Sequence, residues 1–188
     1  MDYKFIDDLF PTEELMAYYH SHPFPFNLPL IKDRLDLKLK ENPDYEVFVP
    51  LYYRKLDRLL KDDRSLKVVN PHYLFISNRG NVISNNMVET FQPISVTTNP
   101  EGEVIIRVNI NNENNTLSLH RALACSFLPV PDHLTAQGLH PKDLEVGHKN
   151  ANKLDFTLGN LQWTALNEHQ NVPPAPIAPE LVAELTQN

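Results

Sequence analysis

The chain has 188 residues, of which 41% are hydrophobic, and this is enough for one substantial core with a small appendage. Its 24 Asp and Glu side chains outnumber its 17 Lys and Arg side chains, so the net charge is −7. Because nucleic-acid affinity comes largely from cationic side chains that neutralise phosphates, this composition argues against an avid DNA-binding protein. No apolar run approaches the roughly 20 residues that span a bilayer, and the N-terminus lacks the basic and apolar regions of a signal peptide. We therefore expect a cytoplasmic protein without a membrane partner.

The first 66 residues predict a mainly helical segment. Residues 1–21 have apolar side chains at helical spacing, and Pro11 followed by Thr-Glu-Glu marks a second helix start. Residues 31–39 alternate apolar and charged side chains, which fits either a strand or a short helix. Residues 52–66 have helical spacing with basic side chains, but aspartates interrupt the basic face, which favours a solvated helix surface over a DNA-facing one.

Residues 73–128 predict two β-hairpins followed by a helix. In residues 73–84 a β-prone run, a turn with glycine and a second run indicate the first hairpin. The second pair of strands is predicted over residues 104–110 and 116–119. Residues 120–128 then predict a helix, and the positions expected in the core around it, including the single cysteine, are Leu119, Leu123, Cys125 and Phe127.

The most informative stretch is EVGHKNANKLDFTLGNLQWTALNEHQ, residues 145–170. Its first residues predict a short strand that ends near His148, and the run of Asn, Asp and Gly that follows is typical of a loop. Residues 161–163 alternate apolar and polar side chains, as a second strand does. Thr164 is expected to cap a helix that begins directly after it and carries His169. Two imidazoles from different elements would then converge on one point, where a metal ion or a scissile phosphate could lie.

This spacing resembles the HNH endonuclease family, in its phage-type and homing-type branch. The resemblance lies in His148, in Asn152-Lys153, in the Asn-Leu-Gln-Trp run that begins at Asn160, and in His169. Residues 73–84 are similar to a small hairpin module that precedes the nuclease motif in many phage proteins of this family, and HRALACSFLP is similar to the helix that leads into it. The resemblance implies an α+β fold in which β-hairpins and a helix precede a ββα-metal unit.

The resemblance also assigns roles. His148 aligns with the general base that takes a proton from the attacking water, and an imidazole suits this role because its pKa lies near the working pH. Asn160 aligns with the residue that braces the loop between the strands. His169 aligns with the helix position that ligates a single divalent cation, Mg2+ or Mn2+, which stabilises charge on the leaving oxygen. The side chains expected to contact DNA are Arg79, Lys149 and Lys153, although Arg79 fits a solvent-exposed turn residue equally well.

One position departs from the family pattern. The residue before the base is usually Asp, Asn or His and supplies the second metal ligand, but here it is Gly147, which has no side chain to donate. Glu145, two residues back on the same strand face, could replace that ligand only if the strand end bends.

The implied organisation has three parts: a helical N-terminal appendage over residues 1–66, a hairpin module with an HNH nuclease-like domain over residues 67–171, and a Pro-rich tail over residues 172–188. Three functions fit it. The first is an endonuclease or nickase that hydrolyses double-stranded DNA in the cytoplasm, which is that of the host cell if a phage encodes the chain. The second is a protein of the same fold without metal binding that serves as a structural or assembly component, for example of a virion, with residues 1–66 contacting protein partners. The third is a DNA-binding module without catalysis, which the acidic composition favours least.

Overall fold

The computed structural model describes residues 3–14, 17, 29–51, 74–85, 91–110, 113–139, 143–150 and 152–165. Three predictions fall on the rest of the chain, namely the helix over residues 52–66, the helix that carries His169 and the Pro-rich tail. They lie outside the described residues and stay predictions.

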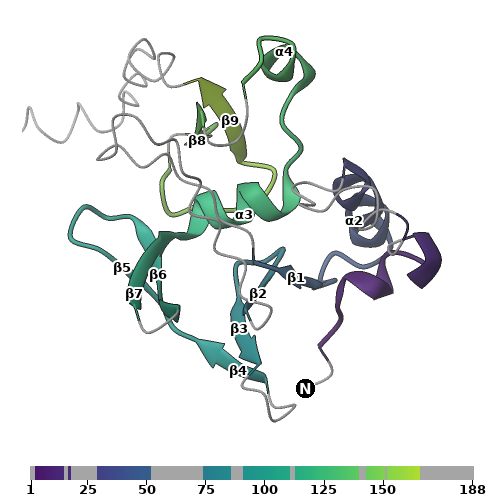
Figure 1. Ribbon diagram of the computed structural model, residues 1–188, viewed down its shortest axis with the longest axis horizontal. Helices are drawn as coiled ribbons and strands as arrows, with labels where there is room; N and C mark the ends of the chain where they lie inside the picture. The colour runs from purple at the N-terminus through teal and green to yellow at the C-terminus, as the bar shows by residue number, and fades with distance from the viewer. Residues whose placement is uncertain are drawn as a thin grey trace, which may run out of the picture.

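The described residues form a mixed α+β structure with antiparallel sheets and few helices (Figure 1). The helices are η1 (Ile6–Asp8), α2 (Pro29–Glu41), α3 (Leu119–Phe127) and α4 (Asp132–Thr135). The strands are β1 (Phe48–Pro50), β2 (Leu74–Ser77), β3 (Val82–Asn85), β4 (Phe91–Ile94), β5 (Val96–Thr98), β6 (Val104–Ile110), β7 (Glu113–Ser118), β8 (Leu144–His148) and β9 (Leu161–Ala165). In the described ranges, no helix combines the length and the apolar character needed to cross a membrane.

Both predicted hairpins are confirmed, since β2 pairs with β3 and β6 pairs with β7, each antiparallel. The turn of the first hairpin needs Gly80, whose φ of +82° is a conformation that glycine adopts at little cost. In the second hairpin β6 has the predicted bounds, but the second strand begins earlier than predicted, because β7 begins at Glu113 and both Asn114 and Asn115 continue the pairing with β6. β7 lies at the edge of its sheet, so polar side chains in this strand can face water.

Three strands and one helix of the described chain, namely β1, β4, β5 and α4, have no counterpart among the predictions. β4 and β5 follow one another and carry the chain from the sheet of order β1-β2-β3-β4 into the sheet of order β5-β6-β7. Pro93 in β4 argues against a strand at the sequence level, but a proline is tolerated here because β4 is an edge strand. α4 is a single turn after Pro131, too short for a periodic pattern to indicate.

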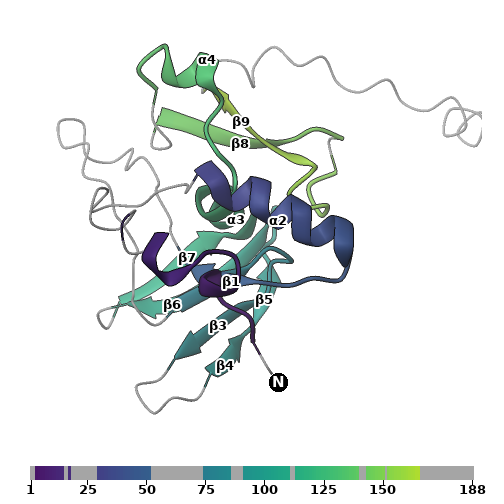
Figure 2. The same ribbon diagram turned by 90° about the vertical axis from the view of Figure 1, so that its right-hand side faces the viewer.

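α3 lies at the centre of the described structure. It contacts β2, β6 and β7 as well as β8 and β9, and Figures 1 and 2 show it between the two larger sheets and the β8–β9 hairpin. The predicted core positions are confirmed: Leu119, Leu123, Cys125 and Phe127 are all buried. A helix of nine residues is marginal on its own in water, so α3 depends on this packing from both sides.

The N-terminal third contributes both helix and strand. Residues 31–39, which fitted either element, belong to the helix α2, where Ile31 and Leu35 are buried one turn apart and Leu37 is 59% exposed. Residues 12–14 are helical directly after Pro11, at the predicted second start.

β1 joins this third of the chain to the hairpin module, because it pairs antiparallel with β2. Asn78, buried in the turn after β2, reinforces the junction: its Oδ1 accepts from the Val47 N–H at 2.8 Å and its Nδ2 donates to the Tyr45 carbonyl at 3.1 Å. Side chains from both regions belong to one hydrophobic core. The predicted division between residues 66 and 67 itself falls outside the described residues.

Candidate functional site

The β8–β9 hairpin carries several of the site residues that the sequence analysis predicts, among them His148 and Asn160. In its register His148 lies opposite Leu161, and Val146 lies opposite Trp163. Because side chains alternate between the two faces of a strand, these four share one face. That face is the one packed on α3, since both strands contact this helix and Val146, Leu161 and Trp163 are buried. His148 therefore sits at the end of β8 on the covered face of the hairpin, whereas Gly147 lies on the other face.

Two polar contacts fix the hairpin on the central helix. The Arg121 guanidinium donates from Nη1 to the Leu144 carbonyl at 2.8 Å. The Trp163 indole donates from Nε1 to the Leu128 carbonyl at 3.1 Å, just beyond the end of α3. The position of His148 relative to α3 is set by these contacts at both strands rather than by the loop.

Asn160 braces the loop between β8 and β9. Its Oδ1 accepts from the Asn150 N–H at 3.0 Å and its Nδ2 donates to the Asp155 carbonyl at 2.7 Å, while its own carbonyl accepts from the Lys149 N–H at 2.8 Å. The side chain is 8% exposed. An asparagine amide offers both a donor and an acceptor, which is what this pair of main-chain groups requires. The contacts agree with the bracing role that the resemblance implies for this residue.

Asp155 holds a negative charge in the same loop. Its carboxylate accepts from the Thr157 hydroxyl at 2.7 Å and from Asn150 Nδ2 at 2.8 Å. These hydrogen bonds, that from Thr157 first, lower the pKa of Asp155. The carboxylate is therefore ionised at neutral pH, and its charge acts on the nearby His148.

The imidazole of His148 is partly buried, and its Nε2 is fully buried and has no hydrogen-bond partner within the part of the chain that the structure describes. Burial lowers the pKa of His148, the Asp155 carboxylate raises it, and the Lys153 ammonium lowers it again. The net direction is downward, so the ring is neutral at neutral pH. A neutral imidazole at the end of a strand, where the loop begins, can accept a proton from water, as a general base does.

His120, which is not among the predicted site residues, lies against His148. The two ring centroids are 5.2 Å apart with the ring planes at 67°, an edge-to-face arrangement. Ser118 Oγ lies 3.0 Å from Nδ1 and 3.2 Å from Nε2 of His120. Burial, together with the neighbouring His148 and the cations Arg121 and Lys153, lowers the pKa of His120 to about 4. The only sequence signal for this contact is that His120 opens the helix similar to the one preceding the family motif.

The three side chains expected to contact DNA lie in the described part of the structure, but they do not gather in one place around His148. Arg79 is in the β2–β3 turn, where Nη2 lies 3.3 Å from Oδ1 of the exposed Asp44. Lys149 donates from Nζ to the Gly159 carbonyl at 2.8 Å, and Lys153 is exposed in the β8–β9 loop. Arg79 is thus held by an acidic partner, while the two lysines flank the loop next to His148.

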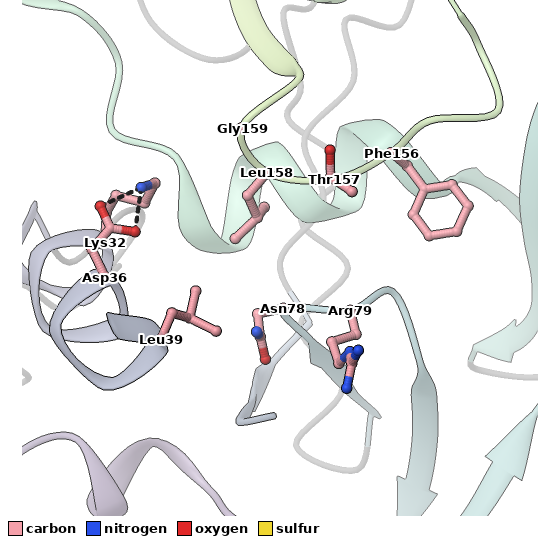
Figure 3. A pocket seen from close by; sticks show the side chains of 9 residues that line it. All are labelled: Lys32, Asp36, Leu39, Asn78, Arg79, Phe156, Thr157, Leu158 and Gly159. Carbon is pink, nitrogen blue, oxygen red and sulfur yellow. Dashed lines mark hydrogen bonds and ion pairs between the residues drawn. The ribbon is translucent and has the colours of Figure 1, made fainter. Parts of the chain in front are cut away.

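A groove of about 370 Å³ separates α2, the β2–β3 turn and the β8–β9 loop (Figure 3). Its lining residues are Lys32, Asp36, Leu39, Asn78, Arg79, Phe156, Thr157, Leu158 and Gly159. The turn and the loop touch at one end of it, because a Cβ at Gly80 would come within 2.9 Å of the Phe156 ring. No imidazole is among the described residues that line the groove, and His148 and His120 form a separate site on the α3 side of the hairpin.

The prediction that a helix begins directly after Thr164 is wrong. Thr164 and Ala165 belong to β9, where they pair with Glu145 and Leu144, and Thr164 Oγ1 donates to the Glu145 carbonyl at 3.4 Å instead of capping a helix. Local propensity at Thr164 is overridden by pairing with β8. His169 lies outside the described residues, so its distance from His148 stays a prediction.

The described residues do not by themselves fit a divalent cation. Within these ranges no three His, Cys, Asp or Glu side chains are grouped as metal ligands. Gly147 is paired in β8 opposite Gln162 and brings no donor, and Glu145 shares its face of the strand, opposite to that of His148. The cation that the resemblance implies thus depends on residues beyond the described part.

Comparison with known proteins yields one likeness. No family model matches the chain, and no curated protein sequence matches it. Among solved structures it is similar to the HNH homing endonuclease I-HmuI, in a structure of DNA binding and cleavage by that enzyme. The two are 19% identical, the match covers 60% of this chain and 59% of that one, and the TM-score is 0.41. At these values the likeness carries no residue role over to this chain.

Proposed function

We propose that the chain is an HNH-type DNA endonuclease or nickase in which His148 is the general base. The observation that carries the proposal is the state of the His148 imidazole: it stands at the end of β8, it is partly buried, and this burial lowers its pKa so that the ring is neutral at neutral pH. A neutral imidazole at a strand end can take a proton from a water that attacks a phosphodiester.

The surrounding residues support this role. Asn160 holds the loop that follows His148, so the ring and the loop keep one geometry. Asp155 places a carboxylate near the ring, which stabilises the imidazolium formed once His148 has taken a proton. Lys149 and Lys153, exposed on the same loop, are the side chains we propose to meet the DNA phosphates, together with Arg79 once it leaves Asp44.

We also propose that hydrolysis requires Mg2+ or Mn2+, with His169 as a ligand. A divalent cation of this kind stabilises the charge that develops on the leaving oxygen. The described residues lack a ligand set, so metal dependence of cutting is the test of this proposal.

A structural or assembly role on the same fold is the second candidate. It is favoured by Gly147, which removes a donor at the position before the base, and by the net charge of −7. In that case residues 1–66 are the region proposed to contact protein partners, for example in a virion.

A plasmid assay separates these candidates. Purified full chain is incubated with supercoiled DNA in millimolar Mg2+ or Mn2+, and we expect nicked or linear product that disappears with a chelator. His148→Ala should abolish cutting, whereas His133→Ala, a matched change of an exposed histidine in α4, should leave it intact. Intact plasmid with every divalent cation would sink the nuclease proposal. Salt-dependent DNA binding without cutting would identify a DNA-binding module.

Gly147→Asp distinguishes an active site from a degenerate one. If the wild type is inactive and this variant cuts, the fold is that of a nuclease that has lost its second ligand. If the wild type cuts and the variant cuts no faster, position 147 is not a ligand position in this chain.

A further inference from the structure

We infer that His120 is a positioning residue for His148: the face of its ring meets the buried Nε2 edge of the His148 imidazole and holds that imidazole in the tautomer with hydrogen on Nε2 and a free Nδ1. The effect on catalysis rests on the proposed function. The tautomer, however, can be measured in a protein without activity.

The ring contact favours one tautomer. Nε2 is the nitrogen of His148 that is withdrawn from solvent, and none of the described residues forms a hydrogen bond with it. The ring packed edge to face against His148 is that of His120, at 5.2 Å between centroids. An N–H at a ring edge is attracted to the electron-rich face of a neighbouring ring, whereas a bare nitrogen presents a lone pair that is repelled by it. The buried nitrogen is therefore better protonated, which leaves Nδ1 to accept a proton.

His120 is itself held in place. Ser118, the last residue of β7, contacts its ring nitrogens through Oγ at 3.0 and 3.2 Å, so one of them is hydrogen-bonded to the hydroxyl. His120 follows two residues later in the first turn of α3, a helix that is buried against both larger sheets and the hairpin. The contact thus links the base to α3, a helix in which seven of nine residues are buried.

Burial is the main cause that keeps both rings neutral, and the charges around the pair modify its effect. Arg121 and Lys153 are the cations that act on His120, and Lys153 and Asp155 are the charged groups that act on His148. A neutral His120 ring retains the electron-rich face that the contact needs. Protonation of His120 would remove this electron-rich face, and the two nearby cations oppose that protonation.

The tautomer is read by nitrogen NMR on the 15N-labelled full chain at neutral pH, because the two ring nitrogens have different shifts when one is protonated and the other bare. The His148 signals are those missing from the His148→Ala spectrum. We expect a protonated Nε2 and a bare Nδ1 in the wild type and in His120→Phe, which keeps a ring face. In His120→Leu, which removes it, the two shifts should move toward each other as the tautomers exchange.

The activity arm uses the same variants. His120→Leu should lower kcat for plasmid nicking about 10–100-fold with KM unchanged, as expected when a base is misplaced but substrate binding is not. His120→Phe should retain most of the wild-type kcat. If the wild type does not nick DNA, the proposed function fails while the spectra still decide the tautomer.

Two spectra would overturn the inference: a wild-type His148 with its hydrogen on Nδ1, or a His120→Leu spectrum in which the His148 shifts are unchanged. Trp163 fluorescence checks that each variant is folded, because this residue is buried beside the contact. If His120→Leu does not fold, Ser118→Ala takes its place, since it removes the hydroxyl that holds the His120 ring and should broaden or shift the same signals.

Discussion

Asn160→Ala is expected to loosen the candidate site and the whole hairpin. The change removes an acceptor for the Asn150 N–H and a donor for the Asp155 carbonyl, at 3.0 and 2.7 Å, from a side chain that is 8% exposed. The main-chain contact between Lys149 and residue 160 remains, so the strands can still pair. The loop that follows His148 loses its internal brace.

The expected cost follows from these two hydrogen bonds. Each contributes about 0.5–1.5 kcal/mol net, and a partner left unpaired in a buried place costs more. Because Asn150 is exposed and Asp155 partly so, water can reach the freed groups, and we expect a total loss of about 2 kcal/mol in the free energy of unfolding. For a chain of this length that is a fall of about 4–8 °C in Tm.

Urea unfolding followed by tryptophan fluorescence is the assay. Trp163 is the single tryptophan of the chain and lies in β9, three residues after Asn160, so its emission reports on this hairpin. The control is Asn152→Ala in the same loop, where an exposed side chain accepts from the Leu154 N–H at 3.0 Å and should cost about 0.5 kcal/mol or less. Equal losses for the two variants would refute the bracing role of Asn160.

Three further predictions concern the contacts around α3 and the loop. Gly80→Ala should destabilise the protein by about 1–3 kcal/mol more than Gly102→Ala. Both glycines have φ near +80°, but of these two only Gly80 would place the new Cβ against another residue, 2.9 Å from the Phe156 ring. Equal melting temperatures for the two variants would contradict this. Trp163→Phe leaves the buried Leu128 carbonyl without its donor and should lower the free energy of unfolding by about 1–3 kcal/mol. Thermal melts followed by circular dichroism measure this, and an unchanged midpoint would show that this hydrogen bond does not stabilise the hairpin on α3. Since the folded pKa of His120 is about 4, below the 6.5 of a free histidine, the folded state binds fewer protons between these values. The contribution of His120 to the free energy of unfolding is fully present above pH 6.5, and about 3 kcal/mol should be lost as the pH approaches 4. Urea unfolding midpoints measure this loss, which should be smaller in His120→Gln.

Local patterns predicted much of the described fold because they act over a few residues. The turn with Gly80 and the alternating runs beside it indicate a hairpin, and the apolar spacing of Leu119, Leu123 and Phe127 indicates a helix; both are present. The prediction for Thr164 failed for the opposite reason. A residue that favours a helix start was drawn into β9 by pairing with β8, a partner about 20 residues earlier.

In the candidate site, too, local features could be predicted from the sequence and contacts between distant segments could not. The strand, the loop and the second strand around His148 could be predicted, as could an asparagine suited to bracing the loop. The contact with His120 could not, because a single sequence does not say which segment covers the inner face of the hairpin. Nor does it indicate that Arg79 would be paired with Asp44, 35 residues away in the chain.

The sequence by itself determined the short elements of this protein and the end of the strand at which His148 stands, since turn chemistry and side-chain periodicity are local properties. Tertiary structure alone decided that β1 from the N-terminal third would complete the first sheet and that α3 would cover His148 with a second imidazole. The physical reason is that burial and ring contact depend on segments far apart in the chain. Those contacts set the charge and the hydrogen bonding of His148, and with them the chemistry that this residue can perform.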